Sequence, residues 1–502
     1  MILGYLISFI LKLYINMKIF RNKCINCKFI EKNITLKCVL NHSLYNNYNM
    51  RIYFKIIILL LLFQGIVRFN KSIRKFNKEL VQNYLNVQKY LNLNFNRLIN
   101  NKIRLGIYTY SLKNGGTQRI TALLLNYIIK INLFDIYIYS QKSKEDNEYY
   151  IPSNNKRTKI KDYKITTLIK KIKKNRINVL IYQFPYYKEI DALNNLKSIK
   201  IIFYQHYSLF YWIYYNYEIF KKLYKSYKKS KYIISLIPLE NQYLFKKWGI
   251  NSILMENFIT YDYKSIIPSN LSSKTIIMIG RGHDKMKRFE LGIMALKNIT
   301  KEIPECQLLI IADIKDFSVK TDNITNLIYA KNIIFPGYTS LPEIYYKNAS
   351  LHIFTSISES FGLVLCETKL YGIPSILLGL DYTTISKGGT IIIYDDKAET
   401  IAKEAIKILK NDNYRKRLGK EARRSMKKFN NDLLSKKWIK LILSIFNEDM
   451  HFPEIKELNN STKIHFLKLI NNQLALLNIR KTNLTILTIN NFENFTFLES
   501  IN

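Results

Sequence analysis

The fold is decided by residues 358–367, which read Ser-Glu-Ser-Phe-Gly-Leu-Val-Leu-Cys-Glu. An apolar run at 351–355 comes before this stretch, and Tyr-Gly-Ile-Pro at 371–374 leads from it into a second apolar run at 375–378. Short apolar runs on both sides of a helical pattern, punctuated by glycine and proline, predict the order strand, loop, helix, turn, strand. The stretch therefore indicates one unit of an alternating α/β domain.

The loop before the predicted helix is suited to an anion. Ser358 or Ser360 would cap the helix by accepting a backbone N–H, and Gly362 would let a ligand approach the backbone closely. Free N–H groups at the positive end of the helix dipole form a binding site for phosphate. Glu359 and Glu367 are spaced so that we expect one carboxylate at each end of the helix, about 12 Å apart. On this spacing alone, two exposed helix carboxylates remain the ordinary interpretation.

The composition is that of a globular protein. Of the 502 residues, 48% are hydrophobic and 23% are charged, which suits two or three domains rather than a disordered chain. Lys and Arg number 78 against 37 Asp and Glu, so the formal net charge is +41. The basic residues are spread along the chain, without a recognition helix, zinc-finger spacing or aromatic RNA-binding motif. We therefore attribute the charge to a biased composition and predict no nucleic-acid partner.

Cysteine usage is compatible with a reducing compartment. Only Cys306 and Cys366 lie in the main body, so the body has no disulfide framework. Cys24, Cys27 and Cys38, with a nearby histidine at position 42, match no zinc-site spacing. We predict no metal site there.

The first hundred residues predict a membrane anchor. Residues 56–67 form the strongest apolar run, and with flanking residues they indicate an anchor at 50–68, slightly shorter than the roughly 20 residues that span a bilayer. A signal sequence and a buried helix remain alternatives. Residues 1–49 would be an extension and 69–101 a linker or stalk. More basic residues follow the run than precede it, so the positive-inside rule predicts a single-pass protein with its body on the cytosolic face, at the endoplasmic reticulum or Golgi in a eukaryote.

Two α/β blocks follow, at 102–265 and 266–447, and a tail at 448–502 has no assignable role. In both blocks, β-branched runs alternate with helical patterns, which predicts two parallel sheets. The expected strands of the first block are 103–109, 136–139, 179–182, 201–204 and 232–237. Those of the second block are 275–279, 308–311, 332–335, 351–354, 375–378 and 390–393. A last amphipathic helix at 431–446 is expected to close the second block.

Motifs of the second block occur in one order at plausible intervals. They are Gly280-Arg281 with Lys287, Phe-Pro-Gly-Tyr at 335–338, Glu-Ile-Tyr-Tyr at 343–346, residues 356–367, and Gly-Ile-Pro at 372–374. This order resembles the C-terminal domain of GT-B retaining glycosyltransferases of the glycosyl transferases group 1 type, family 4. The first block is similar to that family at Gly-Gly-Thr-Gln-Arg, 115–119, and at Asn257. The resemblance implies a GT-B fold, with two doubly wound Rossmann-like domains facing across a cleft, here with an N-terminal apolar anchor.

The resemblance also implies a donor site. Arg281 and Lys287 would bind the donor diphosphate, Glu359 would hold hydroxyls of the transferred sugar, and Glu367 would bind the ribose. The remaining positions that match the family pattern are Gly115 and Gly116 in the first-domain loop, backbone N–H groups near Phe361, Gly362 and Leu363, Tyr338 as a donor-binding residue, and His206 facing the donor sugar. His206 and Glu359 would be catalytic. Gln118 departs from the more usual Glu of the family, which leaves an acid–base role for that loop in doubt.

We therefore predict a transferase that moves a sugar from a UDP- or GDP-sugar to an acceptor hydroxyl with retention of anomeric configuration. The acceptor would be a glycan or a lipid-linked molecule near the membrane. No Asp-x-Asp motif stands in a suitable loop, so we predict metal independence and no cofactor. A catalytically inactive GT-B protein that binds a nucleotide or a partner is the first alternative, and a soluble glycan-storage enzyme is the second.

Overall fold

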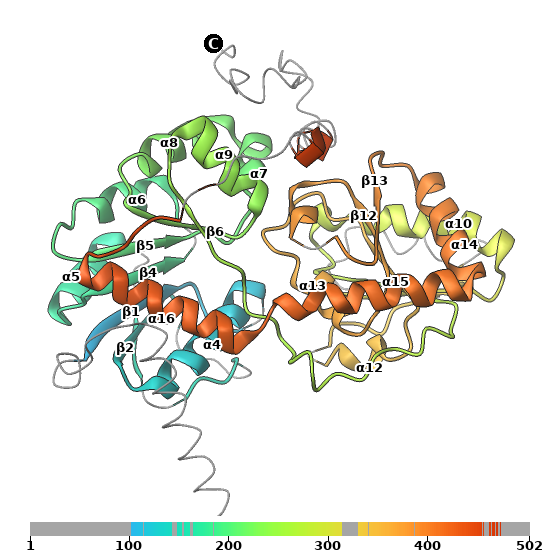
Figure 1. Ribbon diagram of the computed structural model, residues 1–502, viewed down its shortest axis with the longest axis horizontal. Helices are drawn as coiled ribbons and strands as arrows, with labels where there is room; N and C mark the ends of the chain where they lie inside the picture. The colour runs from blue at the N-terminus through green and yellow to red at the C-terminus, as the bar shows by residue number, and fades with distance from the viewer. Residues whose placement is uncertain are drawn as a thin grey trace, which may run out of the picture. The chain divides into compact units, whose positions relative to one another are not determined.

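The computed structural model describes residues 102–472, with gaps at 114, 143–147, 153–154, 161–163, 184, 314–329, 340 and 386 and at several positions between 454 and 471 (Figure 1). The expected extension at 1–49, anchor at 50–68 and linker at 69–101 lie outside the described residues. Within the described part of the chain, no helix combines the length and apolar character needed to cross a bilayer.

The first domain is built on a parallel sheet. Its strands are β1 (Ile103–Thr109), β2 (Phe134–Ser140), β3 (Lys156–Lys159), β4 (Val179–Gln183), β5 (Lys200–Tyr204), β6 (Tyr232–Ser235) and β7 (Ile253–Leu254). They lie in the order β3-β2-β1-β4-β5-β6-β7, and the recorded pairings are parallel. Every residue of β4 is buried. Continuous Ile, Leu, Val and Tyr runs suit such strands because helices cover both faces of a parallel sheet.

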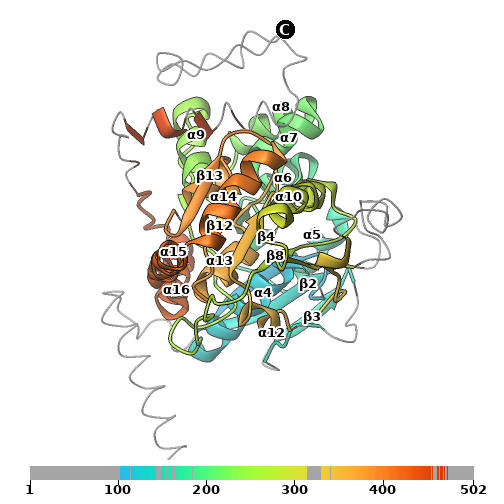
Figure 2. The ribbon, with the colours of Figure 1, turned by 90° about the vertical axis from the view of Figure 1, so that its right-hand side faces the viewer.

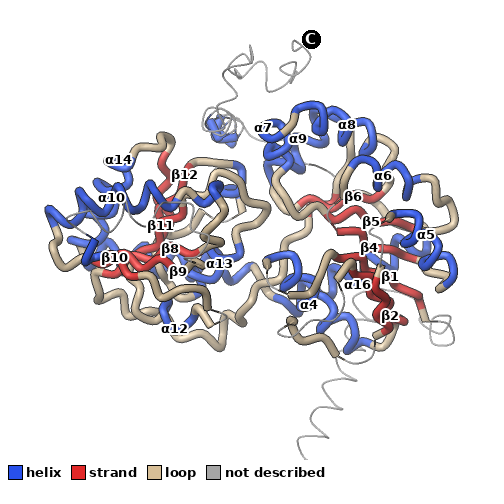
Figure 3. The backbone as a smooth tube through the Cα atoms, turned by 180° about the vertical axis from the view of Figure 1, so that it is seen from behind, coloured by secondary structure: helices blue, strands red, loops and turns tan. Residues whose placement is uncertain are grey.

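The second domain repeats this architecture. Its strands are β8 (Thr275–Ile279), β9 (Gln307–Ile311), β10 (Ile333–Ile334), β11 (Leu351–Phe354), β12 (Ser375–Leu378) and β13 (Thr390–Ile393). They lie in the order β10-β9-β8-β11-β12-β13, again in parallel pairs. The two sheets appear as separate stacks of red strands in Figure 3. The prediction of two parallel sheets is thus confirmed for the described residues.

Helices connect the strands in both domains. In the first domain they are α4 (Gly116–Ile128), α5 (Ile165–Lys174), α6 (Tyr187–Asn194), α7 (Leu209–Tyr215), α8 (Tyr217–Tyr227) and α9 (Pro238–Trp248). From the second domain onward they are α10 (Phe289–Glu302), α12 (Glu343–Tyr346), α13 (Leu363–Leu370), α14 (Ala398–Lys410), α15 (Asp412–Ser425) and α16 (Asn431–Asn447). Short 3-10 turns include η3 (Lys285–Lys287) and η5 (Asp381–Thr384). Each sheet can therefore present the carboxyl ends of its strands, where doubly wound folds bind ligands.

We had expected helix α16 to close the second block. It packs against the first domain instead. Its Trp438 is fully buried, and the Trp438 ring lies 5.1 Å from the ring of Tyr204 on β5. Asn431 also binds the backbone of Ile259. Figure 1 shows α16 running along the first domain and α15 along the second, and Figure 2 shows both helices nearly end-on. The apolar periodicity of α16 correctly predicts a buried face but carries no information about which sheet covers it.

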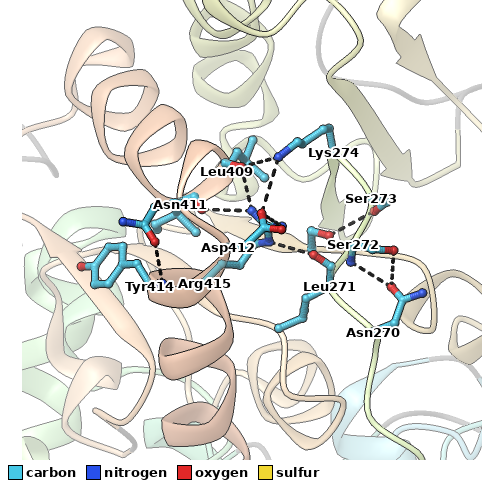
Figure 4. Close-up of polar contacts among 12 residues, drawn as sticks. Asn270, Leu271, Ser272, Ser273, Lys274, Leu409, Asn411, Asp412, Tyr414 and Arg415 are labelled. Atoms are coloured by element: carbon cyan, nitrogen blue, oxygen red, sulfur yellow. Dashed lines mark hydrogen bonds and ion pairs between the residues drawn. The ribbon is translucent and has the colours of Figure 1, made fainter.

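A buried arginine fixes the segment that enters the second sheet. The guanidinium of Arg415 on α15 donates to the carbonyl oxygens of Leu271, Ile408 and Leu409 and pairs with Asp412 at 2.6 Å. Figure 4 shows the contacts of Arg415 with Leu271, Leu409 and Asp412, together with the Lys274 bond to Leu409. Arg415 is fully buried, and its donors satisfy carbonyls at the end of α14 that the helix leaves unpaired. The start of β8 is thereby held against α14 and α15.

Candidate donor-binding site

Helix α13 begins with a glycine rather than with a serine cap. Its N-cap is Gly362, with φ 71° and ψ 61°, and no side chain caps the first turn. This left-handed conformation strongly favours glycine because a Cβ would clash with the backbone. The expected capping by Ser358 or Ser360 is therefore wrong. The first turn of α13 offers backbone N–H groups that its own loop side chains do not cap, as an anion seat requires.

We had expected one glutamate at each end of the helix, but the structure places them differently. Glu359 lies in the loop four residues before α13 begins at Leu363, and Glu367 lies in the middle of the helix. The left-handed turn at Gly362 delays the start of the helix and separates the two carboxylates by a bend. They face different surroundings as a result.

Glu359 pairs with Lys287. The Lys287 ammonium donates to the Glu359 carboxylate, and both side chains are about one-sixth exposed. Lys287 lies over Gly280, where an added Cβ would come within 3.1 Å of the lysine stem. The Thr355 hydroxyl donates to the Lys287 carbonyl at 2.8 Å, and the Ile357 N–H donates to the Met286 carbonyl. The loops that follow β8 and β11 thus meet and hold a cation and a carboxylate side by side.

The other predicted cation of this loop stands apart. The Arg281 side chain is 70% exposed and pairs with Asp284 at 3.0 Å. A surface ion pair of this kind contributes little to stability, typically less than about 1 kcal/mol. The structure thus brings Lys287 to Glu359 and leaves Arg281 at the rim of the same loop.

The glycine loop of the first domain meets the start of α13. Gly115, with φ 123°, is the N-cap of α4. A Cβ on Gly116 would come within 3.3 Å of the Leu363 side chain. One turn further along both helices, Arg119 Nη1 donates to Glu367 Oε1 at 2.5 Å. The N-terminal turns of α4 and α13 therefore lie close together, and the Arg119–Glu367 ion pair joins the two helices one turn later.

Glu367 is enclosed by a network of hydrogen bonds. It is only 2% exposed. Oε1 accepts from Arg119 and from the Thr260 hydroxyl at 2.7 Å, and Oε2 accepts from the Tyr346 hydroxyl at 2.8 Å. Burial is the largest influence on the Arg119 pKa and lowers it, but the Glu367 carboxylate, together with Tyr149 and Tyr261, raises the pKa by more in sum. The carboxylate expected to bind ribose thus joins the first domain, the connecting segment and the second domain.

His206 lies at the carboxyl end of β5, two residues beyond the strand. It is 7% exposed, and its ring centroid lies 3.9 Å from that of Tyr204. Burial lowers the His206 pKa to about 3, so the imidazole is neutral at physiological pH. A neutral imidazole can accept a hydrogen bond and orient a hydroxyl, whereas a permanent positive charge is ruled out.

Phe361 and Tyr338 have contrasting surroundings. The Phe361 side chain is 1% exposed and packs edge-on against Phe429, so only its backbone is available to a ligand. Tyr338 follows Gly337, which has φ 82°, and is 61% exposed. Partial burial is the main cause that raises the Tyr338 pKa. The neighbouring Tyr149 raises the pKa further, and Arg119 lowers it. Tyr338 thus extends from the second domain toward first-domain residues.

The sequence predictions missed several residues of the network. Arg119 and Tyr346 stand inside quoted motifs but received no role, and Thr260 was not singled out. Their partner Glu367 is 248 residues from Arg119 in the chain, and such a long-range contact leaves no periodic signal in one sequence. Within the described residues, no group of three or more His, Cys, Asp or Glu side chains is arranged to hold a metal ion. Metal independence stays a prediction.

Solved structures with the same fold are enzymes and complexes of the GT-B class. Sucrose-phosphate synthase from Thermosynechococcus elongatus superposes with a TM-score of 0.59 at 15% identity, over 69% of this chain and 100% of that one. Anabaena HepE in complex with UDP and glucose superposes with a TM-score of 0.55 at 13% identity, over 68% and 99%. At these identities the likeness shows the fold alone, which is α/β of the GT-B type.

The second domain carries the family signal. Residues 262–425 match the family described as Glycosyl transferases group 1, so the chain contains a domain of this family. Poly(glycerol-phosphate) alpha-glucosyltransferase from Bacillus subtilis is 26% identical over 180 residues, which are 35% of this chain and 25% of that protein. N-acetyl-alpha-D-glucosaminyl L-malate synthase from Bacillus anthracis is 28% identical over 158 residues, 31% of this chain and 41% of that protein. The chain thus spans less than half the length of either relative.

Proposed function

We propose that the protein is a glycosyltransferase that moves a sugar from a nucleoside diphosphate donor to an acceptor hydroxyl with retention of anomeric configuration. The observation that carries the proposal is the meeting of the first turns of α4 and α13 near the Lys287–Glu359 pair. Two helix N-termini attract an anion, and an ammonium adds a full charge. A diphosphate is the leaving group that such a site suits.

The residues divide the reaction between them. When the bond between the anomeric carbon and the diphosphate breaks, negative charge grows on the leaving phosphate oxygen. Lys287 and the first N–H groups of α13 would stabilise that charge in place, which is electrostatic catalysis. Glu359, held by Lys287, would accept hydrogen bonds from sugar hydroxyls, and neutral His206 would orient the sugar from the first domain. The rest of the rate enhancement would come from positioning donor and acceptor.

The donor is a UDP- or GDP-sugar in this proposal. The Bacillus subtilis relative is named as a glucosyltransferase, and the Anabaena structure contains UDP and glucose, which favours testing UDP-glucose first. We propose no cofactor and no metal ion. The apolar run at 56–67, within the predicted anchor at 50–68, supports a membrane-associated protein with its body on the cytosolic face, and a glycan or lipid-linked acceptor.

A panel of UDP- and GDP-sugars tests the proposal. Release of the nucleoside diphosphate would be followed for the wild type, Lys287→Ala and Lys285→Ala. Lys285 lies in the same η3 turn but is exposed, so it is a matched control. We expect a loss of about 10²–10³-fold for Lys287→Ala, the usual effect of removing one group that stabilises developing charge, and little change for Lys285→Ala. Binding without turnover for every donor would favour the inactive GT-B alternative, and no binding would contradict the proposal.

A further inference from the structure

We propose that Arg119 is a clasp on the ribose end of the donor site: it pairs with Glu367 and must release it before a ribose can bind there. The inference rests on the proposed function, in which Glu367 receives the ribose. It goes beyond that function because it makes Arg119, a first-domain residue, the gate to a second-domain site.

The acceptor capacity of Glu367 is largely used. A carboxylate oxygen has two lone pairs, and both lone pairs of Oε1 accept hydrogen bonds, one from Arg119 and one from Thr260. Oε2 accepts from Tyr346, which is itself fully buried. A ribose diol donates two hydrogen bonds, so it cannot engage both oxygens of Glu367 while all three donors remain. At 2% exposure, the carboxylate also presents almost no surface to an incoming ligand.

Arg119 is the donor best placed to leave. Its side chain is 26% exposed, whereas that of Glu367 is 3% exposed. Thr260 belongs to the segment that connects the domains, and Tyr346 belongs to α12 of the same domain as Glu367. The other contacts of Arg119 are long, 3.4 Å to the Tyr149 hydroxyl and 3.2 Å to Thr260. Withdrawal of Arg119 therefore opens Glu367 from the solvent side and leaves the second domain intact.

The helices supply a reason for the clasp to open with a diphosphate. Arg119 holds α4 beside α13 with both positive dipole ends together, an arrangement that is unfavourable without an anion. The Arg119–Glu367 bond offsets this repulsion when no ligand is present. A bound diphosphate neutralises the two N-termini directly, so the bond to Glu367 is no longer needed to hold the helices. Phosphate binding and ribose access are coupled through one ion pair.

The consequence is a gain in nucleotide affinity when the clasp is removed. If only a fraction of the protein has Glu367 open, the apparent dissociation constant is raised by the inverse of that fraction. For an open fraction of about one tenth, Arg119→Gln tightens binding about tenfold. Inorganic pyrophosphate has no ribose and profits only through the coupling between the helix N-termini and the clasp, so its affinity should rise less than that of UDP or GDP.

The experiment measures dissociation constants of UDP, GDP and inorganic pyrophosphate by calorimetry on the full chain. Arg119→Gln opens the clasp, and Arg119→Lys keeps a cation that can restore it. Arg157→Gln is the matched control, because Arg157 forms a comparable ion pair with Glu148 in the same domain, at 2.5 and 2.8 Å. Thermal unfolding checks that each variant folds, and if Arg119→Gln does not fold, Thr260→Val loosens Glu367 instead.

The clasp predicts that Arg119→Gln binds UDP and GDP more tightly and shows a smaller gain for pyrophosphate, whereas Arg119→Lys and Arg157→Gln bind all three as the wild type does. Equal or weaker UDP and GDP binding in Arg119→Gln would overturn the clasp while leaving the proposed function standing. Weaker pyrophosphate binding would instead make Arg119 a diphosphate ligand, which also overturns it. A wild type that binds neither UDP nor GDP contradicts the proposed function itself, and the clasp with it.

Discussion

The two ends of the candidate site differ in how they are built. The Lys287–Glu359 end is made by two loops of the second domain, and both side chains keep some exposure. The Glu367 end is made by both domains and the connecting segment, and its carboxylate is sealed. The difference teaches that the ion pair of the diphosphate and sugar end forms within one domain, whereas the ion pair of the ribose end depends on how the domains meet. Variants at the two ends should therefore fail in different ways.

The largest effect is expected at the Lys287–Glu359 end. Glu359→Gln removes the charged acceptor for sugar hydroxyls and should lower turnover about 10³-fold, in the range seen when a group aimed at the reacting centre is lost. Because the pair is partly exposed and confined to one domain, the free energy of unfolding should change by less than about 1 kcal/mol. Steady-state kinetics and urea unfolding measure both. A loss of stability as large as that expected for Glu367→Gln would contradict the proposed difference between the two ends of the site.

Glu367→Gln should affect stability and binding together. Breaking a buried ion pair from one side costs about 3–5 kcal/mol, and Glu367 is bonded by three donors. We expect a decrease of about 3 kcal/mol in the free energy of unfolding, together with weaker nucleotide binding. Urea unfolding and calorimetric titration measure the two effects. A variant as stable as the wild type would show that the network does not join the domains.

A second interdomain contact should respond to pH. Ser208 of the first domain donates to Asp381 of η5 at 2.7 Å, and Gln205 and the Leu209 N–H donate to the buried Glu240 of α9. Burial, and then the Asp381 carboxylate, raise the Glu240 pKa well above its ordinary value of 4.5. Tyr207 and Tyr227 also face this pair. The folded protein therefore holds a proton that the unfolded chain releases.

The direction in which pH changes the folding stability follows from this raised pKa. The stability contributed by protonated Glu240 is complete below about pH 4.5 and is lost as the pH rises toward the folded-state pKa. Glu240→Gln imitates the protonated form, so we expect its stability to exceed that of the wild type by a margin that grows as the pH rises above about 4.5. Thermal unfolding across pH measures this gap. A gap that does not change with pH would mean that Glu240 is charged in the folded protein.

A smaller loss of stability than that of Glu367→Gln is expected at Tyr346. Tyr346→Phe removes one of three donors to Glu367 and fills the same space. A hydrogen bond to a charged group contributes about 1.5–3 kcal/mol, so the loss should be smaller than for Glu367→Gln. Urea unfolding measures it, and Tyr243→Phe is a control in the core of the first domain. An effect equal to that of Glu367→Gln would place most of the network energy in this single bond.

The strands were the most predictable part of the fold. Those at 275–279, 351–354, 375–378 and 390–393 match the expected bounds residue for residue, because short β-branched runs between turn residues have few other interpretations. The packing partners of the helices were harder to predict. Helix α16 has the expected bounds within one residue but packs on the other domain. A single sequence shows that a helix has an apolar face and not which partner covers it.

The donor-binding roles of the site residues stay predictions, and their geometry was only partly predictable. Lys287 and Glu359 meet, and a Cβ on Gly116 would lie 3.3 Å from the Leu363 side chain. The serine cap failed because Gly362 adopts a left-handed conformation and moves the start of the helix. The role of Arg119 stayed hidden because its position in a glycine-rich motif suggests ligand contact, whereas its partner is set by the packing of two domains.

The most direct test of the central claim follows the phosphorus nuclei of the donor. In a ³¹P NMR titration of UDP or GDP, the account predicts that both diphosphate resonances shift and saturate at one equivalent of wild type or Lys285→Ala. The same titration with Lys287→Ala should show no saturation over that range. Resonances that shift equally with Lys287→Ala, or that do not shift with the wild type, would contradict a diphosphate site at the start of α13.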